Sequence, residues 1–223
     1  MTTKKTQPEE ISSAKEEISS EENFSKSIKA FNRWDTQGIV VDDIGLKNYI
    51  SLVPRLVPKT GGRYAGNRFH KSKIFIVERL INKIMTPGHR GKKHSKTSYP
   101  MTGKAHTSYR IVEEAFKIIE QKTKENPIKV FVRAIENSAQ REEIVTIEYG
   151  GARYPKAVEC APQRRVDLVL RYMTQGAYAK SFNTKKHIIN TLADEIMSAY
   201  SKSNLSNAIT KKLEIERQAD TAR

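Results

Sequence analysis

Apolar side chains recur every three to four residues along much of this 223-residue chain, and this spacing constrains the fold more than any other feature. Such spacing places side chains on one face of an α-helix. The first run ends before Pro87 and Gly88, residues that stop a helix. Its apolar face consists of Ile74, Val77, Leu80, Ile81 and Ile84. The pattern predicts a mainly α-helical protein.

Further helices are predicted from the same period. Asn126 and Pro127 form a favourable helix start, because asparagine caps the first turn and proline fits inside it. The expected helices cover residues 107–124, a segment starting at Asn126, a segment opened by Pro162, a segment capped by Thr184 that includes residues 188–200, and the polar segment 206–223 with Ile209 and Leu213 as its only strong anchors.

Between residues 142 and 159 the pattern changes to that of β-strands. A β-favouring run precedes Gly150 and Gly151, and such a pair favours a hairpin turn. Pro155 lies in the return strand, where proline suits an edge or a projecting hairpin. We therefore expect a bundle of about six helices with one long projecting β-hairpin, forming a single domain over residues 25–223.

The first residues have a different composition. Residues 1–22 hold six Glu and three Lys with few large apolar side chains, so we expect residues 1–24 to be a flexible acidic tail. Phe31 and Trp34 follow and predict an arm that packs on the body. A single cysteine, Cys160, and the lack of a signal sequence or of about 20 consecutive apolar residues indicate a cytoplasmic protein without a membrane partner.

Positive charge is concentrated in one part of the chain. The net charge is +15, and residues 55–110 hold fourteen Lys and Arg against one acid, Glu78. Such an excess repels itself in a compact state unless a polyanion is present. Nucleic acid, an anionic membrane surface or an acidic protein would each satisfy it. A solvated face that only promotes solubility is the alternative, although such faces usually mix both signs.

Two glycine-containing segments of this window are suited to a phosphate chain. The connection over residues 86–107 is too long for an inert link, has no acid and interleaves aromatic with basic residues; a mobile solvated loop is the alternative. Gly61, Gly62 and Gly66 would allow close approach of the backbone to phosphates. The candidate phosphate contacts are Arg63, Arg68, Lys71, Lys73, Lys83, Arg90, Lys92, Lys93, Lys96, Lys104, Arg110, Arg164 and Arg165.

The hairpin is a second candidate surface. Its basic and aromatic side chains could reach into irregular RNA, or its tyrosines could simply pack across the strands, and both interpretations remain open. The residues concerned are Tyr149, Gly150, Gly151, Arg153, Tyr154 and Lys156.

Enzyme motifs fail on spacing. Gly91-Lys92 and Gly103-Lys104 resemble the ends of phosphate-binding loops, but no Ser or Thr follows to bind magnesium. The histidines lack metal-ligand spacing, and Cys160 lacks the surroundings of a nucleophile. We expect no catalytic residue, metal or cofactor. A DNA-binding regulator and an RNA-modifying enzyme are the alternatives to an RNA-binding structural protein.

Several blocks of residues resemble a known family. They are Gly103-Lys104 through Ile111-Val112 to Ala115, the Asn126-Pro127 helix start, Tyr149-Gly150-Gly151 with Tyr154, and Pro162 with Arg164-Arg165. In order and spacing they are similar to ribosomal protein S-seven of the small subunit, over about residues 28–223. Leu192-Ala193-Asp194-Glu195 and the closing segment 209–223 resemble the archaeal and eukaryotic branch. Residues 88–102 look inserted, and residues 1–24 match no family pattern.

The resemblance implies a helical fold with a long hairpin and primary binding to the 3′ major domain of small-subunit ribosomal RNA, which nucleates head assembly. It implies a place at the subunit interface near the decoding centre and exit site, with the hairpin close to transfer RNA and messenger RNA. It implies the S-eleven protein as a neighbour and no homo-oligomer. Carried over by position, Gly150, Gly151, Arg153 and Tyr154 would form the hairpin tip and its return, Arg164 and Arg165 the start of the next helix, and Lys104 the end of the RNA-facing loop.

Overall fold

The computed structural model describes residues 28–63, 65–90 and 93–223, with only the backbone for residues 90, 93 and 94. The expected acidic tail, residues 1–24, lies outside the described residues. No helix in the described ranges is both long enough and apolar enough to span a lipid bilayer.

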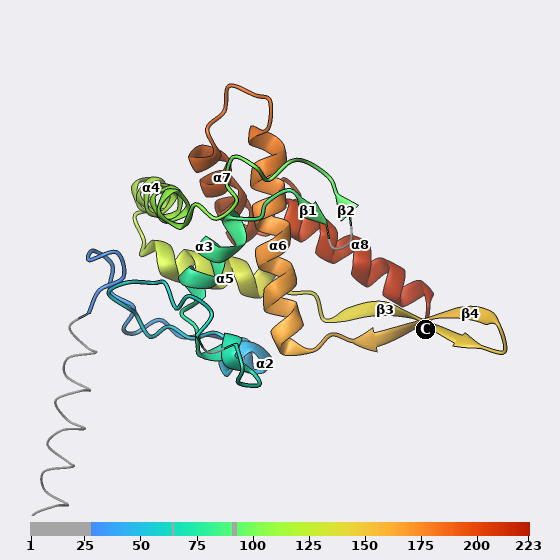
Figure 1. Cartoon of the computed structure of the whole chain (residues 1–223). Helices are drawn as coiled ribbons and strands as arrows, with labels where there is room; N and C mark the ends of the chain where they lie inside the picture. Colours follow the sequence, from blue (N-terminus) through green and yellow to red (C-terminus); the bar gives the residue numbers. More distant parts are fainter. Residues whose placement is uncertain (1–27, 64, 91–92) are drawn as a thin grey trace, which may run out of the picture.

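Over the described ranges the chain forms seven α-helices, one 3₁₀-helix and two antiparallel two-stranded ladders (Figure 1). In chain order they are α2 (Ile44–Lys47), η1 (His70–Lys73), α3 (Ile76–Ile84), β1 (His89–Arg90), β2 (Lys93–His94), α4 (Ala105–Thr123), α5 (Pro127–Ser138), β3 (Glu142–Tyr149), β4 (Ala152–Glu159), α6 (Pro162–Ser181), α7 (Ile188–Tyr200) and α8 (Asn207–Thr221). The prediction of a mainly helical bundle with one long hairpin is confirmed, while the small β1–β2 ladder was not predicted.

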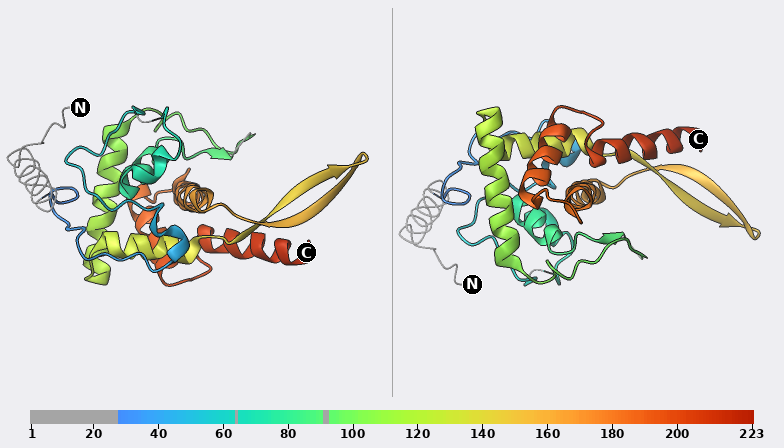
Figure 2. Two further views of the ribbon diagram at one scale, coloured as in Figure 1. Left: turned by 90° about the horizontal axis from the view of Figure 1, so that it is seen from below. Right: turned by 90° about the horizontal axis from the view of Figure 1, so that it is seen from above.

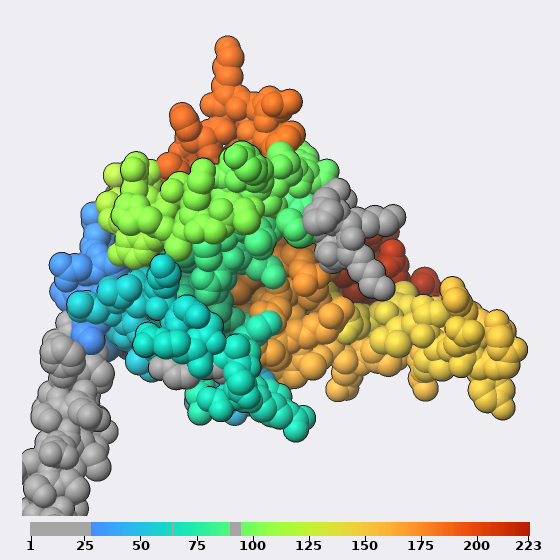
Figure 3. Space-filling view, in the orientation of Figure 1, coloured from blue at the N-terminus to red at the C-terminus, as the bar shows by residue number. Residues whose placement is uncertain are grey.

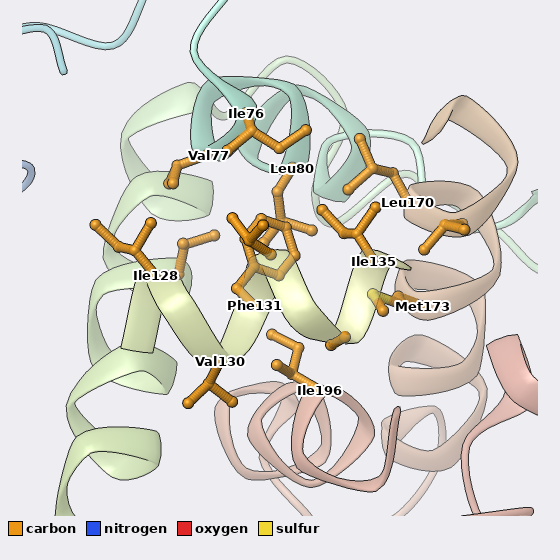
Figure 4. Close-up of a cluster of buried hydrophobic side chains, with 14 of the residues drawn as sticks. Ile76, Val77, Leu80, Ile128, Val130, Phe131, Ile135, Leu170, Met173 and Ile196 are labelled. Atoms are coloured by element: carbon orange, nitrogen blue, oxygen red, sulfur yellow. The ribbon is translucent and has the colours of Figure 1, made fainter. Parts of the chain in front are cut away.

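Helix α5 lies at the centre of the core. Eight of its twelve residues are buried, and its start is as predicted, with the Asn126 side chain accepting a hydrogen bond from the Ile128 amide at 3.0 Å. Phe131 points toward Leu80 of α3, while Ile196 of α7 lies on the other side of α5 (Figure 4). Full burial of each such side chain contributes about 1.5–3 kcal/mol, so this cluster is the main source of stability.

The segment before α2 packs on the body, as predicted for the arm. Phe31 and Trp34 meet the ring of Phe116 in α4 with centroids 6.0 and 5.9 Å apart, and Trp34 is buried. Edge-to-face packing of this kind adds to the burial energy. Leu46 of α2 is also fully buried, so the arm closes one side of the core.

Two details of the helix ends differ from expectation. The predicted cap at Thr184 is wrong: α7 begins after His187, and the Thr184 hydroxyl instead donates to the carbonyls of Lys180 and Ser181 at the end of α6. Leu213 was expected to anchor α8 but is 51% exposed. The buried residues of α8 are Ile209 and two alanines, since α8 lies close to α6 and β3, where small side chains fit.

The β3–β4 hairpin extends away from the helical body, between α8 and the β1–β2 ladder (Figure 2). Gly150 and Gly151 form its turn with φ of 57° and 81°, a conformation that glycine adopts without steric cost. At its base Arg223 pairs with Glu142 at 2.5 Å, and the Arg141 amide donates to Glu216 of α8 at 3.0 Å. Helix α8 therefore braces the base of the hairpin, and the rest projects as predicted.

Helices α6, α7 and α8 meet around the buried carboxylate of Glu195. It accepts hydrogen bonds from Lys180 at 2.7 Å and from the Ser206 hydroxyl at 2.8 Å. Gly176 of α6 allows this close approach, because a Cβ there would lie 2.6 Å from the Cβ of Asn207.

Replacing Gly176 by Ala should therefore destabilise the protein. Alanine favours a helix over glycine by about 1 kcal/mol, but overpacking a tight contact costs about 1–3 kcal/mol. We expect the free energy of unfolding, measured by denaturant titration, to fall by about 1 kcal/mol or more after this partial offset. Gln218→Ala, on the exposed face of α8, is the control and should stay within about 0.5 kcal/mol. A more stable Gly176→Ala variant would contradict the close packing.

Candidate nucleic-acid interface

A basic pocket forms in the segment between α2 and α3. It has a volume of about 250 Å³, and it is lined by Arg55, Asn67, Arg68, His70, Lys73 and Ile74. The guanidinium of Arg68 lies over the ring of Phe69, 4.8 Å from its centroid, which orients that charge. Predicted residues Arg68 and Lys73 are thus brought together. Arg63, also predicted, is exposed nearby, and its Nε donates to the Thr60 carbonyl at 3.3 Å.

Helix η1 and α3 are fastened to α6 through one carboxylate. Asp167 accepts from Lys71 and from Arg79, each at 3.1 Å, and Ser72 donates to Gln163 at 2.9 Å. Burial acts to raise the pKa of Asp167, but Arg79 and Lys71 outweigh it and hold that pKa below its usual value. The sequence-predicted Lys71 therefore has a structural partner and remains half exposed.

Cations crowd around this carboxylate. Burial and the neighbouring charges of Arg171, Lys71 and Arg79 lower the pKa of Lys83, opposed by Asp167. Lys71, Arg79 and Lys83 thus share one nearby acid, Arg171 adds a further positive charge close to Lys83, and an anion would stabilise the excess.

The segment 86–104 is held against α6 rather than detached from it, in the part that the structure describes. The Gly88 amide donates to the Ser98 hydroxyl at 2.9 Å, and Tyr178 of α6 donates to the Thr97 carbonyl. Lys96 reaches the Ala179 carbonyl at 3.4 Å and lies over the Phe182 ring. Only glycine fits at position 88, because a Cβ there would lie 2.0 Å from the Lys96 carbonyl oxygen.

The remaining predicted residues of this region are placed as follows. Lys104 is the residue at the N-cap position of α4, and it is exposed. Arg110 lies in the second turn of α4 and pairs with Glu114 at 3.4 Å. Arg90 lies in β1 and Lys93 in β2, and the structure describes these two residues by their backbone alone. Lys92 lies outside the described residues.

The two arginines after the hairpin have different environments. Arg164 is half exposed and binds Glu143 through two nitrogens, a contact that raises its pKa. Arg165 is buried and donates to Asp43 at 2.8 Å and to the Gln140 carbonyl at 3.0 Å. Arg165 therefore ties the arm to the base of the hairpin, and its guanidinium is already used inside the protein.

The hairpin presents two unlike faces. On one face Tyr154 lies opposite Ile147, Lys156 opposite Val145, and Tyr149 near the turn is 82% exposed. On the other face Arg153 pairs with Glu148 at 3.5 Å. The hairpin, residues 142–159, contains four glutamates and only two basic residues, Arg153 and Lys156, so its net charge is not positive. Tyr154 packs across the strands in part, while the Tyr149 ring remains available for stacking.

These surfaces lie on one side of the molecule. The segment around residues 53–73, α4 and the hairpin are all visible on the face shown in Figure 3, coloured cyan to teal, light green and gold. Sequence reasoning missed Arg55, His70 and Arg171. Arg55 and His70 fall within the basic window, but the approach of Arg171 to Lys83 depends on how α3 packs on α6 and leaves no local signal.

Comparisons with known proteins identify close relatives. The family model described as ribosomal protein S7p/S5e matches residues 46–223. A protein of Nanoarchaeum equitans is 55% identical over 196 residues, which cover 88% of this chain and 99% of that protein. Proteins of Methanothrix thermoacetophila and Archaeoglobus fulgidus are 47% and 45% identical, over 88% and 89% of this chain and 100% and 96% of theirs. All three are described as small ribosomal subunit protein uS7.

Substitution Asp167→Asn should destabilise the protein at neutral pH by about 1–3 kcal/mol, because the buried guanidinium of Arg79 would lose its carboxylate. The folded-state pKa of Asp167 is lowered, so its contribution is present above its ordinary value of 3.8 and is lost as the pH falls through the folded value. Unfolding curves from pH 7 to pH 2 should show the difference between the two proteins shrinking in acid. Asp194→Asn, which removes an exposed pair with Lys122, should cost under about 1 kcal/mol. A difference independent of pH would contradict this role of Asp167.

Proposed function

This chain belongs to the ribosomal protein S7p/S5e family, and from that premise we propose that it is a non-enzymatic structural protein that binds the 3′ major domain of small-subunit ribosomal RNA and nucleates assembly of the head. It is a protein of the small ribosomal subunit in the cytoplasm, and so part of a ribonucleoprotein that acts in translation. Family membership favours RNA over the duplex DNA, the anionic membrane surface and the acidic protein that charge alone leaves open.

The crowding of cations around Asp167 is the observation that supports the RNA-binding part of this proposal. Lys71 and Arg79 bind the Asp167 carboxylate from two elements, Lys83 lies close enough to feel its charge, and Arg171 of α6 lies close enough to act on Lys83. Lys73, in the same short helix η1 as Lys71, lines the pocket that contains Arg68. Because internal hydrogen bonds hold η1 and α3 on α6, the charges are placed before RNA arrives. Phosphates bound there would be fixed relative to one another, which is what a protein that organises an RNA junction requires.

The hairpin supports a different contact. Its tip carries an exposed tyrosine and little net charge, which suits stacking on a base more than neutralising phosphates. We place the protein at the subunit interface near the decoding centre and exit site, with the hairpin close to exit-site transfer RNA and messenger RNA and the S-eleven protein as a neighbour. The projection of the hairpin beyond the body supports such a reach (Figure 1).

The affinity of the protein for a 3′ major domain RNA fragment should depend steeply on salt. If about seven phosphates are neutralised, the slope of log affinity against log salt should be on the order of −5 or steeper. Arg68→Ala with Lys73→Ala should reduce the magnitude of that slope by about 0.7–0.9 per cation removed. Lys122→Ala with Lys129→Ala removes two exposed cations that pair with Asp194 and Glu125, and is the matched control. Equal slopes for the two double variants would refute the proposed interface.

Tyr149→Ala should separate the hairpin from the ribosomal-RNA surface. We expect less than about twofold change in affinity for the RNA fragment, but release of exit-site transfer RNA from reconstituted subunits to become about fivefold faster or more, since one base stack contributes about 1–3 kcal/mol. Thr146→Ala, on the opposite hairpin face, should change neither quantity. If Tyr149→Ala impaired RNA-fragment binding and left transfer RNA release unchanged, the assignment of the hairpin would be wrong.

A further inference from the structure

An apolar groove with a cationic edge lies between α4 and the segment before α3. It has a volume of about 340 Å³ and is lined mostly by carbon, with Leu56, Val57, Ile81 and Tyr109 among its walls. Leu56 and Val57 are 78% and 67% exposed. Adjacent exposed aliphatic side chains beside an apolar groove are typical of a surface that binds another molecule or segment. Lys59 and His106 also line the groove, and none of its lining residues is acidic.

The charge and the walls of the groove define the ligand that fits. Aliphatic walls favour an aliphatic side chain, and the cationic edge favours carboxylates beside it. A peptide in which acids precede an aliphatic residue would satisfy both.

Such a peptide is present in this chain. The sequence Glu-Glu-Ile-Ser-Ser occurs twice, at residues 9–13 and 16–20, with isoleucines Ile11 and Ile18 seven residues apart. Residues 1–22 hold six Glu against three Lys, opposite in sign to the groove. The family model matches residues 46–223, so the repeats lie outside the part of the chain that carries the family match.

The chain between the repeats and Phe31 is long enough for the repeats to reach the groove. The described chain begins at residue 28, and three residues later the Phe31 ring packs on Tyr109 at a centroid distance of 4.7 Å. Tyr109 is itself a wall of the groove. The chain from Ile18 to Phe31 can span at most roughly 45 Å. Joining two sites through a link of this length gives an effective concentration on the order of millimolar.

We propose that the Glu-Glu-Ile-Ser-Ser repeats dock in this groove in the RNA-free protein, with an isoleucine against Leu56, Val57 and Ile81 and glutamates beside Lys59 and His106. The docked acids neutralise part of the basic surface. In the second part of the proposal, which rests on the proposed RNA-binding function, RNA displaces the repeats, so they weaken RNA binding without preventing it. At an effective concentration of millimolar, even an intrinsic dissociation constant of 0.1–1 mM would weaken RNA binding by only about two- to tenfold.

Zero-length carbodiimide cross-linking of the full chain without RNA tests the docking. Peptide mapping should show bonds between the repeat glutamates and Lys59. The double variant Ile11→Ser, Ile18→Ser keeps every charge and the tether, and should reduce these bonds several-fold. Leu56→Ser should do the same without unfolding the protein, because Leu56 is exposed. Cross-links to Lys124, exposed at the end of α4, measure random encounter and should not change. Equal Lys59 cross-linking in all three proteins would overturn the proposal.

Affinity for the RNA fragment tests the displacement. At low salt the Ile11→Ser, Ile18→Ser variant should bind about two- to tenfold more tightly than the unchanged chain, and the gap should close as salt rises. If the variant loses its Lys59 cross-links but binds RNA no more tightly, displacement is refuted. If neither protein binds the RNA with a steep salt dependence while the cross-links persist, the proposed function fails and the docking stands.

Discussion

Helix α5 is apolar around most of its circumference, and such a helix has to be covered on nearly every side before the chain is stable. Helices α4, α6 and α7 pack around it, and α3 closes the remaining side over Phe131 (Figure 4). The long connections are thereby forced to the outside. Because both basic connections then lie against α6, the position of the candidate interface follows from the burial of a helix that carries none of the candidate contact residues.

Charges inside the fold decide which cations remain available to a ligand. Arg165 and Arg79 are buried and paired, and Arg164 is bound to Glu143, so their guanidinium groups stabilise the protein. Lys83 and Lys73 have no comparable carboxylate of their own in the described part of the chain. The protein thus uses some of its positive charge to position the rest, and rigid positioning lowers the cost of binding.

The helices and the long hairpin could be predicted because their signals are local: apolar period, the Asn126 cap and the Gly150-Gly151 turn. The failures have a common physical cause. Arg164 and Arg165 are adjacent and chemically identical, but consecutive helical residues point about 100° apart. Only the fold shows that Arg165, and not Arg164, binds Asp43. Likewise, the basic window indicated the region of the interface, whereas Asp167, which organises it, lies 88 residues from Arg79. Leu213 and Thr184 failed because their packing and capping depend on neighbouring helices.

The bracing of the hairpin has a mechanical consequence. Each strand has eight residues and spans roughly 27 Å. A small rotation of the hairpin at its base, where Glu142 and Glu143 pair with Arg223 and Arg164, is therefore amplified at the tip. A tilt of about 5° at the base would move the tip by about 2 Å. The two ion pairs and the hydrogen bond from the Arg141 amide at the base therefore help to determine where the Tyr149 ring, at the far end of the hairpin, can reach.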